Sequence, residues 1–194
     1  YISLDKFASI AAGTSGFCDC VLGWDVNDQL YDNASFTGWH TAFPDAKYCV
    51  DLTTERSLPD EDNCPLFIVE FVGEENGLHP ICPRNLLRRI LQKADTMGFS
   101  AHMAFEYEFF IFDETPQTLR EKNYQNLTPL SPGNFGYSVL RNSSLSDLFH
   151  EFMDYCEAID FPLEGLHCET GPGVWEAAIT VDNALKATDK AALF

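Results

Sequence analysis

The chain has 194 residues, of which 45% are hydrophobic and 13% aromatic, so we expect one large or two small folded domains. With 12 basic and 30 acidic residues, its net charge of −18 works against nucleic acid and anionic membranes as partners. The sequence has neither a membrane-length apolar run nor a secretory signal, so we expect a cytoplasmic protein. Its 7 cysteines at irregular spacing are expected to be reduced thiols, not disulfides or zinc ligands.

The first part of the chain predicts a small sheet with little helix. A short helix is expected over residues 4–12, and the alternating apolar positions of residues 17–26 predict a strand. Residues 47–55 and 66–72 are rich in β-branched and aromatic side chains and predict two more strands.

The middle of the chain predicts a helix, a strand and a long loop. Residues 83–97 place apolar side chains on one helical face, and Gly98 is expected to end this helix. The aromatic-rich residues 100–113 predict a strand. Residues 114–138 have no regular period and several Pro and Gly residues, which is typical of a lid or a substrate-facing loop.

The last part alternates helix and strand. Ser144 begins a capping-box pattern and predicts the start of a second main helix. Residues 164–180 predict two short strands around a Gly-Pro-Gly turn, and residues 182–194 predict another helix. Because the chain starts at Tyr1 and ends inside this helix, we interpret it as a fragment.

Four glutamates stand in apolar strand contexts. Glu106 and Glu108 are two residues apart and should leave one face of their strand, while Glu169 and Glu176 flank the Gly-Pro-Gly turn. Converging carboxylates repel one another unless a cation neutralises them, and oxygen ligands favour Mg²⁺ or Mn²⁺. An ordinary solvent-exposed Glu-x-Glu strand remains an alternative, and so does a carboxylate-lined metal-binding module of another kind of protein.

Four segments together resemble the glutamine synthetase superfamily. FEYEFFIFD (105–113) resembles its Glu-x-Glu strand, and HCETGPGVWEAAI (167–179) is similar to its second glutamate signature. YDNASFTGW (31–39) resembles its N-terminal Asp-containing loop with a downstream Trp, and residues 83–99 resemble the helix before the Glu-x-Glu strand. The resemblance spans about the whole chain but only the first part of the family's length.

The resemblance implies an α+β fold in two parts. Residues 1–79 would form a β-grasp-like N-terminal domain. Residues 80–194 would begin a glutamine-synthetase-type catalytic domain, with a curved antiparallel sheet and flanking helices, truncated at the end of the chain.

The resemblance also implies two metal ions, Mg²⁺ or Mn²⁺, with ATP as co-substrate. It assigns Glu108, Glu169 and Glu176 as ligands of one ion and Glu106 as a ligand of the second. The other ligands of the second ion and the glutamate-binding groups lie downstream in the family.

Three further residues acquire roles from the same resemblance. Glu164 matches a position that contacts the nucleotide. Asp32 and Trp39 match a loop that reaches a neighbouring subunit's active site, where the Asp helps to bind and deprotonate the amine. A homo-oligomer with active sites between subunits is therefore implied.

The implied activity is ATP-dependent ligation of the glutamate γ-carboxylate to ammonia or an amine through a γ-glutamyl phosphate. We expect the chain by itself to be inactive, because a partial site loses the positioning on which phosphoryl transfer depends. The alternative is a catalytically inactive, glutamine-synthetase-like structural or assembly protein.

Overall fold

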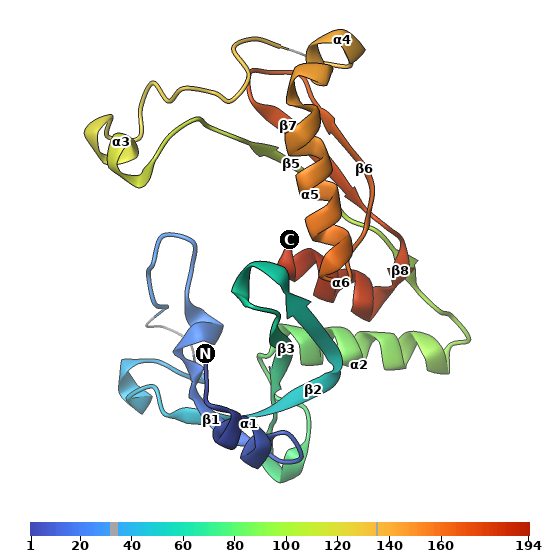
Figure 1. The fold of residues 1–194 in the computed structure, drawn as a ribbon. Coiled ribbons are helices and arrows are strands. Elements are labelled where there is room, and N and C mark those ends of the chain that lie inside the picture. Colours follow the sequence, from blue (N-terminus) through green and yellow to red (C-terminus); the bar gives the residue numbers. More distant parts are fainter. Residues whose placement is uncertain (32–34, 135) are drawn as a thin grey trace. The chain divides into compact units, whose positions relative to one another are not determined.

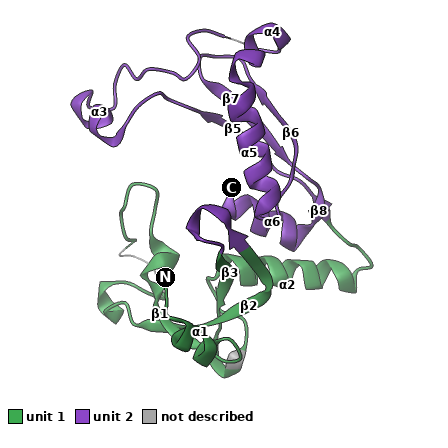
Figure 2. Ribbon diagram, in the orientation of Figure 1, with its two compact units in different colours: residues 1–56, 64–101 green, residues 57–63, 102–194 purple. Residues whose placement is uncertain are grey.

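The computed structural model describes residues 1–31, 35–134 and 136–194. The chain forms two compact units, residues 1–56 with 64–101 and residues 57–63 with 102–194 (Figure 2). Helices and antiparallel strands occur in both, as Figure 1 shows, which confirms the α+β class. The β-grasp-like character of the first part and the boundary at residues 79/80 stay predictions. Every described helix is too short or too polar to cross a bilayer.

Unit 1 is built on a three-stranded sheet in the order β1-β2-β3, with β1 antiparallel to β2. Its elements are α1 (Leu4–Ile10), β1 (Ser15–Cys18), η1 (Asp19–Gly23), η2 (Trp39–Thr41), β2 (Asp45–Leu58), β3 (Cys64–Phe71), η4 (Glu74–Asn76) and α2 (Pro83–Thr96), where η denotes a 3₁₀ helix. The last residues of β2 and the 3₁₀ helix η3 (Pro59–Glu61) fall in unit 2.

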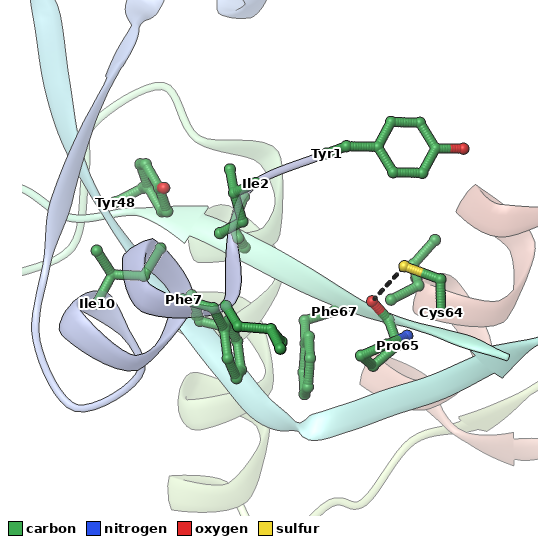
Figure 3. A pocket seen from close by; sticks show the side chains of 12 residues that line it. Tyr1, Ile2, Phe7, Ile10, Tyr48, Cys64, Pro65 and Phe67 are labelled. Atoms are coloured by element: carbon green, nitrogen blue, oxygen red, sulfur yellow. Dashed lines mark hydrogen bonds between the residues drawn. The ribbon is translucent and has the colours of Figure 1, made fainter. Parts of the chain in front are cut away.

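Helix α1 packs through its apolar side against the sheet of unit 1. Phe7 stacks on Phe67 of β3 with ring centroids 4.9 Å apart. An apolar cavity of about 460 Å³ remains beside this contact, and Tyr48 and Cys64 are among its lining residues (Figure 3). The helix therefore covers the sheet incompletely.

The predicted strand over residues 17–26 is wrong beyond Cys18. The chain turns there into the 3₁₀ helix η1, and the amide of Asp19 donates to the carbonyl of Pro44. The side chain of Asp19 is buried and accepts a hydrogen bond from Thr37. A buried polar contact thus overrides the alternating apolar pattern, which by itself favours a strand.

Helix α2 is tied to the sheet by a four-residue ion-pair network. Arg84 contacts Asp51 of β2 at 2.7 Å and Glu70 of β3 at 3.1 Å, and Arg88 contacts the same two carboxylates at 3.0 and 2.9 Å. Burial works to raise the pKa of Asp51, but hydrogen bonds from Thr53 and Arg84 lower it overall. The network therefore holds the helix through charges that are largely removed from water.

We predict that Arg84→Met lowers the free energy of unfolding by about 2–3 kcal/mol, because it leaves two partly buried carboxylates with one arginine. Urea denaturation of the purified chain measures this change. Arg89→Met is the matched control, since Arg89 is exposed on the same helix and should change stability by less than about 0.5 kcal/mol. Equal losses in both variants would contradict the structural role of the network.

Unit 2 contains a three-stranded antiparallel sheet in the order β5-β7-β6 and a separate β4–β8 pair. Its remaining elements, in chain order, are β4 (His102–Met103), β5 (Glu106–Phe110), α3 (Pro116–Glu121), α4 (Val139–Asn142), η5 (Ser143–Leu145), α5 (Ser146–Ala158), β6 (Leu163–Cys168), β7 (Val174–Ile179), β8 (Asp182–Asn183) and α6 (Ala184–Leu193). The expected strand over residues 100–113 is therefore broken, because β4 pairs with β8 and β5 with β7.

One face of the β5-β7-β6 sheet forms the core of unit 2. Trp175 and Ala177 of β7 are 0% exposed, and Phe149 of α5 stacks on Trp175 with ring centroids 4.3 Å apart. The hydroxyl of Tyr107 on β5 donates to the carbonyl of Ala191 in α6 at 2.8 Å. Because side chains alternate along a strand, the neighbouring residues of β5, β6 and β7 are directed to the opposite face.

The expected loop over residues 114–138 contains the short helix α3, and Glu114 makes hydrogen bonds within it. That carboxylate accepts hydrogen bonds from the Thr118 hydroxyl at 2.5 Å, the Thr128 amide at 2.6 Å and the ammonium of Lys122. These contacts, with Lys122 the largest, lower the pKa of Glu114 to about 2. Glu114 thus ties Thr118, Lys122 and Thr128 of this segment together.

Because the pKa of Glu114 is depressed, its contribution to loop stability should be complete above pH 4.5 and lost as the pH falls toward about 2. We predict that the hydrogen-exchange protection of the Thr128 amide falls across this window. The amide of Leu130, which donates to the carbonyl of Ile111, is the internal control. A parallel loss of protection at both amides would point to general acid unfolding instead.

Candidate metal centre

Three polar side chains form a row across the open face of the β5-β7-β6 sheet. Glu176 on the central strand β7 is paired in register with Glu108 on β5 and with His167 on β6. Residues directly opposite one another in antiparallel strands project from the same face and lie close together. The row therefore arises from strand register, with Glu176 at its centre.

His167, Glu169 and Glu176 come closest together, and we name these three the acidic cluster. The Nε2 atom of His167 lies 3.1 Å from an oxygen of Glu169 and 3.8 Å from an oxygen of Glu176. One potential ligand atom from each residue lies within 4.8 Å of the others. The two glutamate side chains are only 14% and 18% exposed, so their charges are partly shielded from water.

The tight turn between β6 and β7 positions both glutamates of the cluster. Gly173 has a φ of +72°, and a β-carbon there would lie 2.6 Å from the carbonyl oxygen of Ile111. The Gly173 amide donates to the buried hydroxyl of Ser131 at 2.7 Å. Glycine is thus required at this position for the turn to pack beside the neighbouring segment.

Tyr137 fixes the carboxylate of Glu169. Its hydroxyl donates to Oε1 of Glu169 at 2.5 Å, and the amide of Thr170 donates to Oε2 at 3.0 Å. The hydrogen bond from Tyr137 contributes most to lowering the pKa of Glu169, and the contact with His167 comes second. The hydrogen bond between Tyr137 and Glu169 also raises the pKa of Tyr137. Glu169 is therefore held as a carboxylate beside a protonated phenol.

The donor set of the acidic cluster fits a divalent cation. Two carboxylates and one imidazole are ligands used for Mn²⁺ and related ions, and purely oxygen sites suit Mg²⁺. Two anionic side chains this close repel one another, so a cation between them would relieve the repulsion. The chemistry and spacing of the residues agree with a metal centre.

The other glutamates predicted as site residues lie on the same sheet. Glu106 is exposed on β5 and pairs with Ala178, two residues along the strands from the Glu108–Glu176 pair. Glu164 is exposed on β6 at the register shift between Leu163 and Gly165. The structure thus brings Glu169 and Glu176 together, sets Glu108 opposite Glu176, and places Glu106 and Glu164 further along the strands.

The two residues predicted to serve a neighbouring subunit belong to unit 1. Trp39 is 69% exposed at the start of η2, and its ring packs edge-on against Phe43. Asp32 lies outside the described residues. Their predicted roles therefore stay predictions.

Two members of the centre were not identified from the sequence. His167 could have been found, because it precedes Glu169 by two residues at the end of a predicted strand. Tyr137 gave no signal, since it lies 32 residues from Glu169 in a segment without periodicity. An open cavity of about 390 Å³ adjoins the cluster, with Tyr137 and His167 in its lining.

These features describe an α+β protein with a carboxylate–imidazole centre on an antiparallel sheet. The glutamine synthetase catalytic-domain family matches residues 80–194. The chain belongs to the glutamine synthetase family, which confirms the resemblance drawn from its motifs.

Several relatives match the chain. It is 42% identical to the type-1 glutamine synthetase 2 of Dictyostelium discoideum, covering 100% of this chain and 37% of that protein. It is 32% identical to a glutamate–isopropylamine ligase of a Pseudomonas species, covering 88% of this chain and 37% of that protein. A crystal structure of a glutamine synthase homologue superposes with a TM-score of 0.71 at 18% identity, over 99% of this chain and 42% of that one. The chain thus spans well under half of the proteins it resembles.

We predict that Glu176→Gln weakens Mn²⁺ binding by at least about tenfold, because it removes the central anionic donor of the cluster. Electron paramagnetic resonance of free Mn²⁺ measures the affinity. Glu157→Gln on the exposed surface of α5 is the control and should change binding by less than about twofold. Equal affinity in wild type and Glu176→Gln would exclude the cluster as the metal centre.

Proposed function

We propose that this chain is the N-terminal part of a longer ligase that joins the γ-carboxylate of glutamate to ammonia or an amine at the expense of ATP. The observation that carries the proposal is the acidic cluster, with Glu108 paired to its central member, in a chain of the glutamine synthetase family. The activity rests on family membership, and the residues of the sheet supply the local chemistry.

The proposed reaction has two steps. The glutamate γ-carboxylate attacks the terminal phosphoryl group of ATP and releases ADP, and the amine then displaces phosphate from the γ-glutamyl phosphate to form the amide. Bound Mg²⁺ or Mn²⁺ would supply charge compensation for the transferring phosphoryl group. Glu108, Glu169 and Glu176 would hold one ion and Glu106 would help to hold the second.

The remaining site residues have distinct proposed tasks. Tyr137 keeps Glu169 oriented through its hydrogen bond of 2.5 Å, and His167 contacts the same carboxylate oxygen at 3.1 Å. Glu164 would contact the nucleotide from the start of β6. Asp32 would bind and deprotonate the amine, next to Trp39, in the active site of a neighbouring subunit of a homo-oligomer.

The acceptor is open to amines other than ammonia. The relatives include a glutamate–isopropylamine ligase and, at 28% identity over 94% of this chain and 39% of that protein, a γ-glutamylethanolamide synthetase of Streptomyces coelicolor. The open cavity beside Tyr137 and His167 has a volume of about 390 Å³, far more than the roughly 30 Å³ share of one water-sized molecule. Both observations favour testing alkyl and hydroxyalkyl amines beside ammonia.

We predict that the full-length protein releases phosphate from ATP only when glutamate, a divalent cation and an amine are all present. Glu169→Gln should reduce kcat/KM by at least about 100-fold, because electrostatic positioning of the phosphoryl group depends on the metal ligands. Asp32→Ala should raise the KM for the amine more than the KM for ATP. Glu157→Gln serves as the surface control. A folded full-length protein with no turnover for any amine would favour a structural or assembly role.

A further inference from the structure

Unit 1 contains a buried hydrogen bond between Thr37 and Asp19, which lies outside the candidate metal centre. The hydroxyl of Thr37 donates to Oδ1 of Asp19 at 2.5 Å. Thr37 is 1% exposed and Asp19 is 3% exposed, so water cannot replace either partner. Such a contact fixes the relative position of two chain segments, because separating them would leave a buried donor and a buried acceptor without this hydrogen bond.

His79 packs against the segment that carries Thr37. Its ring lies edge-on to Phe36, with centroids 4.8 Å apart, and 5.6 Å from the ring of Phe71 on β3. Its amide donates to Oδ1 of Asn85 in α2 at 2.6 Å. Burial lowers the pKa of His79 although Asp19 works to raise it, so the ring serves as a neutral packing surface. The segment is thereby joined to both the sheet and α2.

The turn that follows Thr37 is closed by local hydrogen bonds. The Gly38 amide donates to the Thr41 hydroxyl at 3.1 Å, and the Ala42 amide donates to the carbonyl of Trp39 at 3.1 Å. Ala42 and Phe43 both have left-handed backbone angles, with φ of +58° and +46°. Consecutive left-handed residues other than glycine persist only where the surroundings hold them in place.

Trp39 lies within this turn and yet is 69% exposed. An exposed indole carries a large apolar surface, and indoles with one side buried and one side open are typical of contact sites. A side chain on an anchored turn meets a partner with less loss of conformational entropy than one on a loose loop.

We propose that Asp19, Thr37 and His79 are positioning residues that fix the orientation of Trp39 on the turn from Phe36 to Phe43. We propose further that this orientation determines the KM for the amine. The second half of this proposal rests on the proposed function, in which Trp39 and Asp32 serve a neighbouring subunit's amine site. None of the three residues is proposed to touch the substrate.

The test uses Thr37→Val in the full-length protein, which removes the hydroxyl donor at nearly constant volume. We expect the KM for the amine to rise about tenfold, with the KM values for ATP and glutamate within about twofold of wild type. Thr37→Ser restores the donor and should bring the amine KM back to within about threefold. Thr96→Val is the control. It removes a hydroxyl that donates to the carbonyl of Lys93 at the exposed end of α2, and it should leave all three KM values unchanged.

A second readout does not depend on activity. Hydrogen exchange of the Thr41 and Ala42 amides should quicken at least about fivefold in Thr37→Val but not in Thr96→Val. If Thr37→Val does not fold, Thr37→Ala takes its place, because it also removes the hydroxyl donor, with the same expected directions. Unchanged exchange in the variant, or equal rises in all three KM values, would overturn the proposal. If the wild-type protein is inactive, the proposed function is refuted, and so is the proposed effect on the KM for the amine. The hydrogen-exchange result would still decide whether the Asp19–Thr37 contact holds the turn in place.

Discussion

Electrostatic repulsion among carboxylates is the constraint around which unit 2 is arranged. Glu176 stands in the middle strand, with Glu108 in register on one side and His167 on the other, in a chain of net charge −18. Like charges at such spacing are destabilising unless they are compensated. The imidazole of His167 contacts both Glu169 and Glu176, and a bound cation would reduce the repulsion between them more fully. The sheet thus holds together a set of charges that favours a metal ion.

Burial of the opposite face of the sheet offsets the cost of that arrangement. Trp175 and Ala177 alternate with Glu176 along β7, so the strand that presents the central carboxylate is also the most deeply buried strand of the sheet. Stacking of Phe149 on Trp175 fixes the strand against α5. Because side chains alternate strictly along a strand, a shift of one residue in register would move the carboxylate into the core. The register of β7 therefore determines both the packing of the core and the position of Glu176.

The sequence predicted the parts of this structure that follow from periodicity. The two faces of β5 follow from alternation and the helix α2 from helical spacing. The motifs pointed correctly to the family, and the resemblance implied the α+β class. Contacts between distant, irregular segments could not be predicted. The strand expected over residues 17–26 ends at Cys18 because Asp19 turns inward to Thr37, and Tyr137 reaches Glu169 from a segment with no period. In each case one polar contact outweighs the local pattern.

The hydrogen bonds of Glu169 show how a cation would have to fit into the centre. Tyr137 donates to Oε1, the Thr170 amide donates to Oε2, and His167 also lies against Oε1. A carboxylate has about four acceptor positions, so capacity remains for a metal bond without loss of the amide contact. His167 and a cation, however, would occupy the same space near Oε1 and the oxygen of Glu176. Binding therefore requires the imidazole either to join the ligands through Nε2 or to turn away, which makes His167 the adjustable member of a centre whose carboxylates are fixed by strand register and by Tyr137.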